Sequence, residues 1–158
     1  MSRCRLIYRS NSIDEMLSEA ALQQLAKESA EKNAARNITG MLLLSGEKFL
    51  QVLEGPVRAV NQLYGNIMND PRHENVTLLT YEPLGPAYFP EWDMVMLDLY
   101  NLPLEPRRLL MSKYESNDGQ IRIPDRLHEV YALLLDAKAI CQLPDAAAVG
   151  LRPVTLAR

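Results

Sequence analysis

The sequence predicts an α+β fold, in which a ferredoxin-like βαββαββ sheet carries two helices on one face and a C-terminal extension adds two more. Two observations within the first hundred residues support this prediction. Short segments with alternating or β-branched apolar residues predict five strands, and two segments with helical spacing of apolar residues lie between them. The order of these elements matches the split βαβ pattern of a ferredoxin-like sheet.

The first strand is predicted over residues 3–9. Its side chains alternate, so that Cys4, Leu6 and Tyr8 point to the same face. Residues 11–16 lack a clear period, and we expect them to form a turn or a loop.

The first helix is predicted to begin after Ser18, a favourable N-cap residue, and to run to about residue 33. Its inward stripe starts with apolar residues such as Leu25 and continues one and two turns later with Ser29 and Asn33. Such a stripe fits either a helix end that reaches solvent or a helix end that borders a polar site.

The second helix is predicted to begin at Pro56, because proline is well tolerated at the first helical position. It is predicted to end near Asn69, since Pro71 disfavours helical geometry in the residue before it. The other strands are predicted at residues 37–44, 48–54, 75–81 and 92–99.

Two further helices are predicted at residues 105–114 and 124–143. The longer one carries an apolar stripe of Leu127, Val130, Leu134, Ala137 and Cys141. This stripe could cover the free face of the sheet or join subunits, and the need of an open sheet face for a cover favours the first. The chain is therefore divided into a sheet domain at residues 1–97, a helical extension at 98–143 and a loosely ordered tail at 144–158.

Composition argues against several classes of function. A formal charge of −3 and a pI near 5.4 argue against nucleic-acid binding, which requires a basic face. No run approaches the length of a membrane span, and the N-terminal residues lack a signal-peptide pattern, so a cytoplasmic protein is expected. Two cysteines and two histidines predict neither a disulfide framework nor a metal site.

One polar residue interrupts an apolar segment. Gln51 lies within Phe-Leu-Gln-Val-Leu at residues 49–53, where a strand should face a core. A buried side-chain amide without partners costs about 1–3 kcal/mol. Gln51 must therefore hydrogen-bond within the protein or contact a polar group that the protein encloses, and the rest of the sequence favours an enclosed ligand.

Other polar side chains are expected close to Gln51. Tyr8 and Asn33 could border a slot between the two helices, and Arg72 and His73 could lie at its mouth. The mouth residues suit a phosphate, because the guanidinium group presents a planar fork of donors. Taken singly, each of these residues other than Gln51 more often has a structural role.

Several segments carry a family resemblance when they are taken together. They are Leu-Ile-Tyr-Arg-Ser at 6–10, Asn33, Asn-Ile-Thr-Gly-Met-Leu-Leu at 37–43, Phe-Leu-Gln-Val-Leu-Glu-Gly at 49–55, Asp-Pro-Arg-His at 70–73 and Trp-Asp-Met at 92–94. In this order and spacing they resemble the BLUF domain, the blue-light sensor that uses FAD. The two later helices resemble the C-terminal extension of the short, stand-alone members of this family.

The resemblance implies a photoreceptor that binds a flavin without a covalent bond. Tyr8 would supply an electron and a proton to the excited flavin, and Gln51 would bridge the phenol and the flavin. Trp92 and Met94 match the fifth-strand pair that responds to the switch. The implied cofactor-binding residues are Tyr8, Leu25, Ser29, Asn33, Gln51, Ile67, Asp70, Arg72 and His73.

The cofactor implied by the resemblance is FAD, with FMN and riboflavin as alternatives. Two departures from the family pattern leave these alternatives open. Lys32 precedes Asn33 where many relatives have a second asparagine, and Asn66 stands where some relatives have a basic residue. Fewer cationic contacts at position 66 would loosen the adenine-diphosphate end of FAD.

The implied photochemistry follows from two side chains. A phenol is neutral below about pH 10 and releases an electron more readily when its proton leaves too, and a glutamine amide both donates and accepts. Light is therefore expected to leave the flavin oxidised with a stronger hydrogen bond at O4, read out as a small reversible red shift. No catalytic activity is expected, and output would be through an unidentified protein partner or a change in a homo-oligomer.

Two other functions remain as alternatives on the same fold. An acylphosphatase-like hydrolase would use Arg72 to bind phosphate, but the sequence lacks a convincing phosphate loop and leaves Gln51 without a role. A small-molecule-binding regulatory module would lack photochemistry altogether. The colour of the purified protein would separate these alternatives from a flavin sensor.

Overall fold

A computed structural model describes residues 2–13, 18–90, 94–115, 120–143 and 151–153 of the 158-residue chain. Its strands are β1 (Arg3–Ser12), β2 (Thr39–Ser45), β3 (Lys48–Pro56), β4 (His73–Pro83), β5 (Val95–Asp98) and β6 (Leu151–Pro153). Its helices are α1 (Glu19–Ala35), α2 (Val57–Met68), the short 3₁₀ helix η2 (Leu99–Asn101), α3 (Leu104–Tyr114) and α4 (Leu127–Cys141). The strands form one sheet in the order β4-β1-β3-β2-β5-β6.

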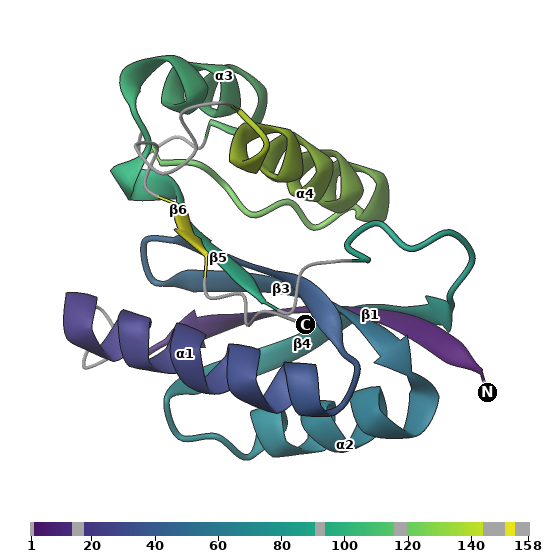
Figure 1. The fold of residues 1–158 in the computed structure, drawn as a ribbon. Coiled ribbons are helices and arrows are strands. Elements are labelled where there is room, and N and C mark those ends of the chain that lie inside the picture. Colours follow the sequence, from purple (N-terminus) through teal and green to yellow (C-terminus); the bar gives the residue numbers. More distant parts are fainter. Residues whose placement is uncertain (1, 14–17, 91–93, 116–119, 144–150, 154–158) are drawn as a thin grey trace.

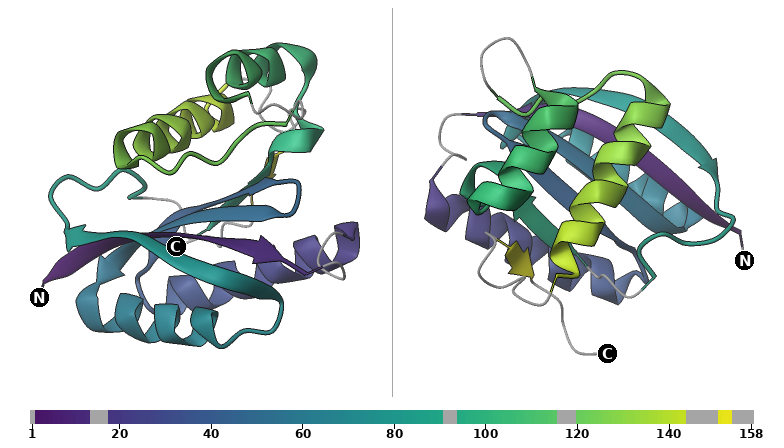
Figure 2. Two further views of the ribbon diagram at one scale, coloured as in Figure 1. Left: turned by 180° about the vertical axis from the view of Figure 1, so that it is seen from behind. Right: turned by 90° about the horizontal axis from the view of Figure 1, so that it is seen from above.

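The sheet has the predicted ferredoxin-like arrangement with strands added at one edge. β1 pairs antiparallel with β3 and with β4, and β3 pairs antiparallel with β2. β5 pairs parallel with β2, so the sheet is mixed. Helices α1 and α2 cover one face, and α3 and α4 cover the other (Figures 1 and 2). The α+β class and both helix pairs are therefore confirmed.

Alternation along β1 divides the core into two clusters. Cys4, Leu6 and Tyr8 pack in the cluster that includes α1 and α2, as their spacing predicts. Ile7 points the other way and belongs to the cluster beneath α3 and α4. The helix pairs therefore bury separate faces of the same strand.

The apolar stripe of α4 covers the sheet face opposite α1 and α2 (Figure 2). Val130, Leu134 and Ala137 are buried in one cluster with Ile7 of β1. This packing decides between the two uses of the stripe that the sequence left open. The predicted stripe also included Leu127. This residue is instead 39% exposed, because it is the first residue of the helix.

Several boundaries differ from the sequence prediction. β1 continues to Ser12, which pairs with β4, so only part of the expected loop at 11–16 lies outside the strand. α1 continues to Ala35, beyond the predicted end. β5 is short and begins at Val95, and it ends where the Asp98 carboxylate accepts a hydrogen bond from the Tyr100 backbone N–H at 3.0 Å and caps η2.

Much of the predicted C-terminal tail lies outside the described residues. The described part is β6, which pairs antiparallel with β5 and which the sequence pattern did not indicate. Residues 91–93 also lie outside the described part, so the predicted role of Trp92 has no structural counterpart here.

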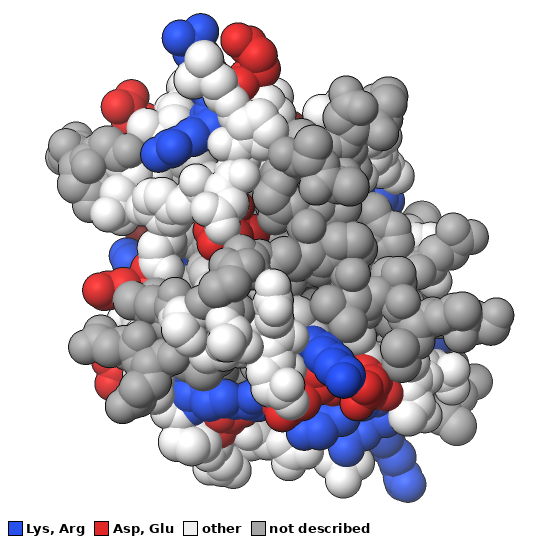
Figure 3. All heavy atoms as spheres, turned by 60° about the vertical axis from the view of Figure 1, so that its left-hand side comes forward, with Lys and Arg blue, Asp and Glu red and all other residues white. Residues whose placement is uncertain are grey.

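The described surface carries charges of both signs. On the face drawn in Figure 3, basic and acidic side chains are interspersed and often lie next to one another. None of the described helices combines the length and the apolar character that crossing a membrane requires.

Candidate functional site

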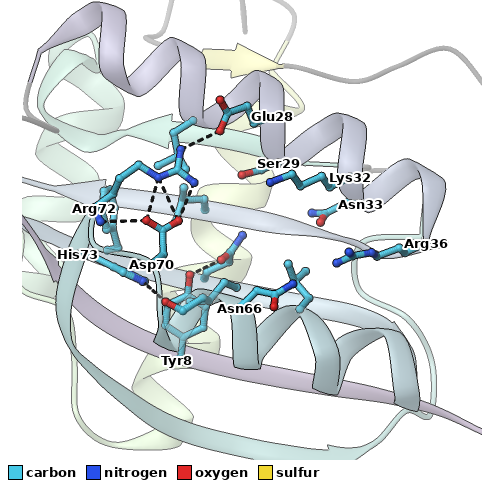
Figure 4. A pocket seen from close by; sticks show the side chains of 16 residues that line it. Tyr8, Glu28, Ser29, Lys32, Asn33, Arg36, Asn66, Asp70, Arg72 and His73 are labelled. Carbon is cyan, nitrogen blue, oxygen red and sulfur yellow. Dashed lines mark hydrogen bonds and ion pairs between the residues drawn. The ribbon is translucent and has the colours of Figure 1, made fainter.

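A pocket of ≈ 140 Å³ lies between α1 and α2, with the sheet as its floor (Figure 4). Side chains from both helices, from four strands and from the connection between α2 and β4 line it. The lining includes every residue predicted to contact a cofactor: Tyr8, Leu25, Ser29, Asn33, Gln51, Ile67, Asp70, Arg72 and His73. The fold thus brings the whole predicted set to one cavity, and their contact with a flavin remains a prediction.

Tyr8 and Gln51 face each other on neighbouring strands. They are directly opposite in the register of β1 and β3, and the Tyr8 hydroxyl donates a hydrogen bond to Gln51 Oε1. Both side chains are buried, at 4% and 5% exposed. Burial raises the pKa of Tyr8 well above its ordinary value, and Tyr64 and Asp70 add to the effect. The phenol is therefore neutral and holds its proton toward the amide.

The other end of the Gln51 amide contacts Met94. Gln51 Nε2 donates to the Met94 sulfur at 3.5 Å, and Met94 is fully buried. A thioether is a weak acceptor. Gln51 therefore joins the two other predicted photoactive residues that the structure describes, Tyr8 and Met94, through one bond to a hydroxyl and one weak bond to a thioether.

Asn33 lies on the polar stripe of α1 and faces the pocket (Figure 4). It is 1% exposed. Because α1 ends at Ala35, the cap residue is Arg36, and the Asn33 carbonyl accepts hydrogen bonds from the backbone N–H groups of Arg36 and Ile38. The polar stripe of α1 therefore borders the pocket, and the side chain at its end, Asn33, is buried there and does not reach solvent.

Arg72 binds two carboxylates of the protein. Its guanidinium donates to both oxygens of Asp70 at 2.6–3.0 Å and to Glu28 of α1 at 2.9 Å (Figure 4). Burial opposes the ionisation of Asp70, but the hydrogen bonds from Arg72 outweigh it and lower the pKa of that carboxyl. The fork that the sequence suggested for a phosphate is therefore occupied by the protein itself.

His73 is also held by protein groups. Its Nε2 lies 2.6 Å from the carbonyl oxygen of Ile67, and its Nδ1 lies 2.8 Å from the Ser10 hydroxyl. A carbonyl only accepts, so Nε2 carries a proton. The ring meets Tyr8 edge-on, with 6.2 Å between centroids. His73 thus fixes one wall of the pocket beside the phenol.

The pocket contains residues that were not predicted as contacts: Glu28, Lys32, Arg36, Leu42, Phe49, Leu63 and Asn66. A helical signal could have found three of them. Glu28, Lys32 and Arg36 repeat every fourth residue, beside the stripe of Leu25, Ser29 and Asn33. Phe49 precedes Gln51 by two positions on β3, so the strand period could have found it too.

The lining chemistry fits a flavin. Leu25 and Ile67 offer apolar walls for a flat ring, and the amides of Asn33 and Gln51 can both donate to and accept from its heteroatoms. Within the described residues, Nη1 of Arg36 is buried and has no hydrogen-bond partner, which suits an anionic group. Polar groups of these types around an apolar slot are what a phosphorylated flavin requires.

Comparison with known proteins identifies relatives of this chain. The E. coli K12 blue light- and temperature-regulated antirepressor BluF is 33% identical over 94 residues, which are 60% of this chain and 23% of BluF. The chain spans only 9–23% of the length of the curated relatives it matches.

Solved structures resemble more of the chain. The dark-state structure of BlrB, a BLUF protein, is 28% identical with a TM-score of 0.71 and covers 90% of this chain and 98% of its own. Klebsiella pneumoniae BlrP1, solved with FMN and cyclic diGMP, is 27% identical with a TM-score of 0.64, over 90% of this chain and 37% of BlrP1.

The family model described as sensors of blue-light using FAD matches residues 4–95, a segment that contains β1 without its first residue, β2 to β4 and every predicted cofactor contact. The Tyr8–Gln51 pair lies at the floor of the pocket within that segment. The matched segment and the geometry of the pocket together show that this chain belongs to the BLUF family of blue-light sensors that use FAD.

Proposed function

We propose that this chain senses blue light by rearranging the hydrogen bonds of Tyr8 and Gln51 around a flavin held in the pocket. A bound flavin would supply the absorption of blue light and an excited state that accepts electrons. The observation that carries the proposal is the buried hydrogen bond from the Tyr8 hydroxyl to Gln51 Oε1.

Among the described residues, the acceptor of the Tyr8 hydroxyl proton is Gln51 Oε1. The phenol is buried and its hydroxyl already donates to Gln51 Oε1, so a phenol that loses an electron can pass its proton to that oxygen. The raised pKa of Tyr8 excludes an ionised phenolate at rest. Proton and electron therefore leave Tyr8 together, and Gln51 receives the proton.

Gln51 has two distinguishable arrangements. In the described one, Oε1 accepts from Tyr8 and Nε2 donates to Met94. Rotation of the amide, or a shift of its proton, would exchange the donor and the acceptor and remove the contact with the sulfur. In a pocket of low dielectric the two arrangements stay distinct, because an unpaired polar group there is costly.

The test is spectroscopic. The purified full chain should be yellow and should show a small reversible red shift under blue light. Gln51→Leu should remain yellow but lose the shift, because leucine is similar in size to glutamine and lacks the amide. A persistent shift in Gln51→Leu would refute the mechanism, and a colourless wild-type protein would refute flavin binding.

FAD and FMN are the cofactors to expect, since BLUF domains bind either flavin and BlrP1 was solved with FMN. The contacts of the predicted set with the flavin are part of this proposal. Leu25 and Ile67 would pack on the ring, and Ser29 and Asn33 would bond its polar edge.

The proposed output begins at Met94, which leads into β5, and ends at α4. The connection between β4 and β5 is bonded to α4, because Lys138 donates to the Tyr88 carbonyl and the rings of Tyr88 and Tyr131 meet edge-on at 5.9 Å. Residues 1–97 would then sense light and residues 98–143 would carry the output, with 144–158 as a tail.

A downstream protein partner is proposed, as the name of the antirepressor BluF suggests for that relative. Formation of a homo-oligomer is also proposed, and the exposed Leu104, Leu109 and Leu135 on α3 and α4 support it. Size-exclusion chromatography in the dark and under blue light would detect a change in the oligomer. A cytoplasmic location is supported by Cys4 and Cys141, which are both free thiols.

A further inference from the structure

The pocket has two basic ends that differ in how their cations are paired. At one end, Arg72 donates to Asp70 and Glu28 and forms ion pairs with both. At the opposite end in Figure 4, the guanidinium of Arg36 points into the pocket from the C-terminal cap of α1. Among the described residues, its Nη1 is buried and has no hydrogen-bond partner. Arg72 is therefore paired with two carboxylates, whereas Nη1 of Arg36 has no partner among the described residues.

The carboxylates of the pocket cannot neutralise Arg36. Glu28 and Asp70 are the acidic residues in its lining, and both bind Arg72. Glu28 precedes Arg36 by eight residues on the helix, which separates their backbones by about 12 Å along the axis. Lys32 lines the pocket between them and adds a second positive charge on the side of Arg36.

A buried guanidinium N–H favours an anion that can accept from it. Leaving such a donor unpaired costs about 1–3 kcal/mol, and more for a charged group. The planar fork of arginine matches phosphate oxygens in particular. Asn66 of α2 lines the same end of the pocket and could donate through its amide (Figure 4).

We infer that the pocket end formed by Arg36, Lys32 and Asn66 is a phosphate subsite, and that it makes the protein select FMN and FAD over riboflavin. The inference rests on the proposed flavin binding. It moves the phosphate from Arg72 and His73, which the sequence suggested, to the C-terminal end of α1. The reason is that two carboxylates already neutralise Arg72 and protein groups already contact both ring nitrogens of His73.

A second role for Arg36 must be separated from this one. A cation at the C-terminus of a helix also offsets the negative end of the helix dipole, so a substitution could act on stability alone. Loss of stability would weaken all flavins equally. Selection of phosphate would weaken only the phosphorylated flavins, so the ratio of affinities distinguishes the two roles.

The experiment titrates the flavin-free full chain with riboflavin, FMN and FAD and follows the quenching of flavin fluorescence. Wild type should bind FMN and FAD at least tenfold more tightly than riboflavin. Arg36→Gln should weaken FMN and FAD about tenfold or more and change riboflavin by less than about twofold, since one charge-assisted hydrogen bond is lost. Arg36→Lys should keep part of the preference, because it retains the charge without the fork.

Two other variants complete the design. Arg108→Gln removes an exposed cation on α3, far from the pocket lining, and should leave all three affinities unchanged. Arg72→Gln should weaken the three flavins alike and keep their ratio, since it loosens the tie between α1 and the connection after α2.

Three results would overturn the inference. They are a wild-type affinity for riboflavin equal to that for FMN, an unchanged ratio in Arg36→Gln, and a lost preference in Arg72→Gln with a preserved one in Arg36→Gln. In each of these the proposed flavin sensing survives. Wild-type protein that binds none of the three flavins would overturn the proposed function together with the subsite.

Discussion

Gln51 and Glu54 lie three residues apart on β3, and their side chains point to opposite faces of the sheet. Glu54 is completely buried, and its carboxylate accepts from Arg5 at 2.9 Å and from the backbone N–H of Phe89 at 2.8 Å. Gln51 has one bond to a phenol and one to a weakly accepting sulfur. Both are buried polar groups, but only Glu54 has a full set of strong partners.

The network around Glu54 is closed on every side. Arg5 also donates to Glu82 at 3.2 Å and to the Pro86 carbonyl at 2.9 Å, and its guanidinium lies 4.0 Å from the centre of the Tyr88 ring. A charge pair that is this well satisfied ties β1, β3 and the connection after β4 together. Among the described residues, both members of this buried pair are bonded to protein groups, and we therefore assign the pair a structural role.

Structural and functional buried polar groups differ in how fully the protein pairs their donors and acceptors. A group whose donors and acceptors are all met by strong partners holds the fold. A group with a weak partner at the wall of a pocket retains capacity for a ligand. Gln51 and Arg36 are of the second kind, and Glu54 is of the first.

The largest expected effect is on the pocket side of this comparison. Tyr8→Phe should abolish the light-induced red shift, because the phenol that releases the proton is removed. It should still bind flavin and lose only about 1 kcal/mol of stability, the worth of one hydrogen bond. Absorption spectra before and after blue light check this, and a normal photocycle in Tyr8→Phe would remove Tyr8 from the mechanism.

The closed network should respond in the opposite way. Glu54→Gln should lower the free energy of unfolding by about 3 kcal/mol, because it leaves the buried Arg5 without its closest counter-charge. Urea unfolding in the dark measures it, with Gln51→Leu as the matched variant on the same strand. We expect Gln51→Leu to cost less than about 1 kcal/mol, and equal costs for the two would refute the distinction.

Alkaline pH should weaken the fold through a buried tyrosine hydroxyl on each face of the sheet. Burial and the hydrogen bond to Glu82 raise the pKa of Tyr131 to about 12, whereas an unfolded tyrosine titrates near 10. Its contribution to stability is therefore complete below about pH 10 and is lost as the pH rises toward 12.

Between about pH 9 and pH 11, the free energy of unfolding should accordingly fall less in Tyr131→Phe than in wild type. Parallel urea titrations at each pH would measure this. Tyr8→Phe should show the same sign on the pocket face, because burial also raises the pKa of Tyr8. A steeper alkaline loss in either variant would contradict the assigned direction.

The smallest effect is expected at the ion pair across the pocket mouth. Glu28→Gln should lower stability by less than about 1 kcal/mol, since Glu28 and Arg72 are each about one third exposed and solvent screens the pair. Thermal unfolding at low and high salt would measure it. A loss comparable with that of Glu54→Gln would show that the mouth is as essential as the buried network.

How much the sequence could predict depended on whether the signal was local. The alternation of Cys4, Leu6 and Tyr8 and the fourth-residue spacing of Leu25, Ser29 and Asn33 are local periods, and both were confirmed as shared faces. The amide of Gln51 stood out because its neighbours are all apolar.

Pairing between distant segments was not predictable in the same way. Asp70 is a near neighbour of Arg72 in the sequence, but the bond from Arg72 to Glu28 and the bond from Gln51 Nε2 to Met94 each join residues more than 40 positions apart. No period in the sequence encodes such a pairing.

The sequence by itself therefore determined most of the elements, the faces they bury and the predicted residues that the structure gathers in the pocket. Only the tertiary structure decided how those members are paired, and thus that Arg72 is ion-paired whereas Nη1 of Arg36 has no partner among the described residues. The physical reason is that burial follows from local patterns of apolar residues, whereas the neutralisation of a charge depends on which side chains the completed fold brings within a few ångströms of one another.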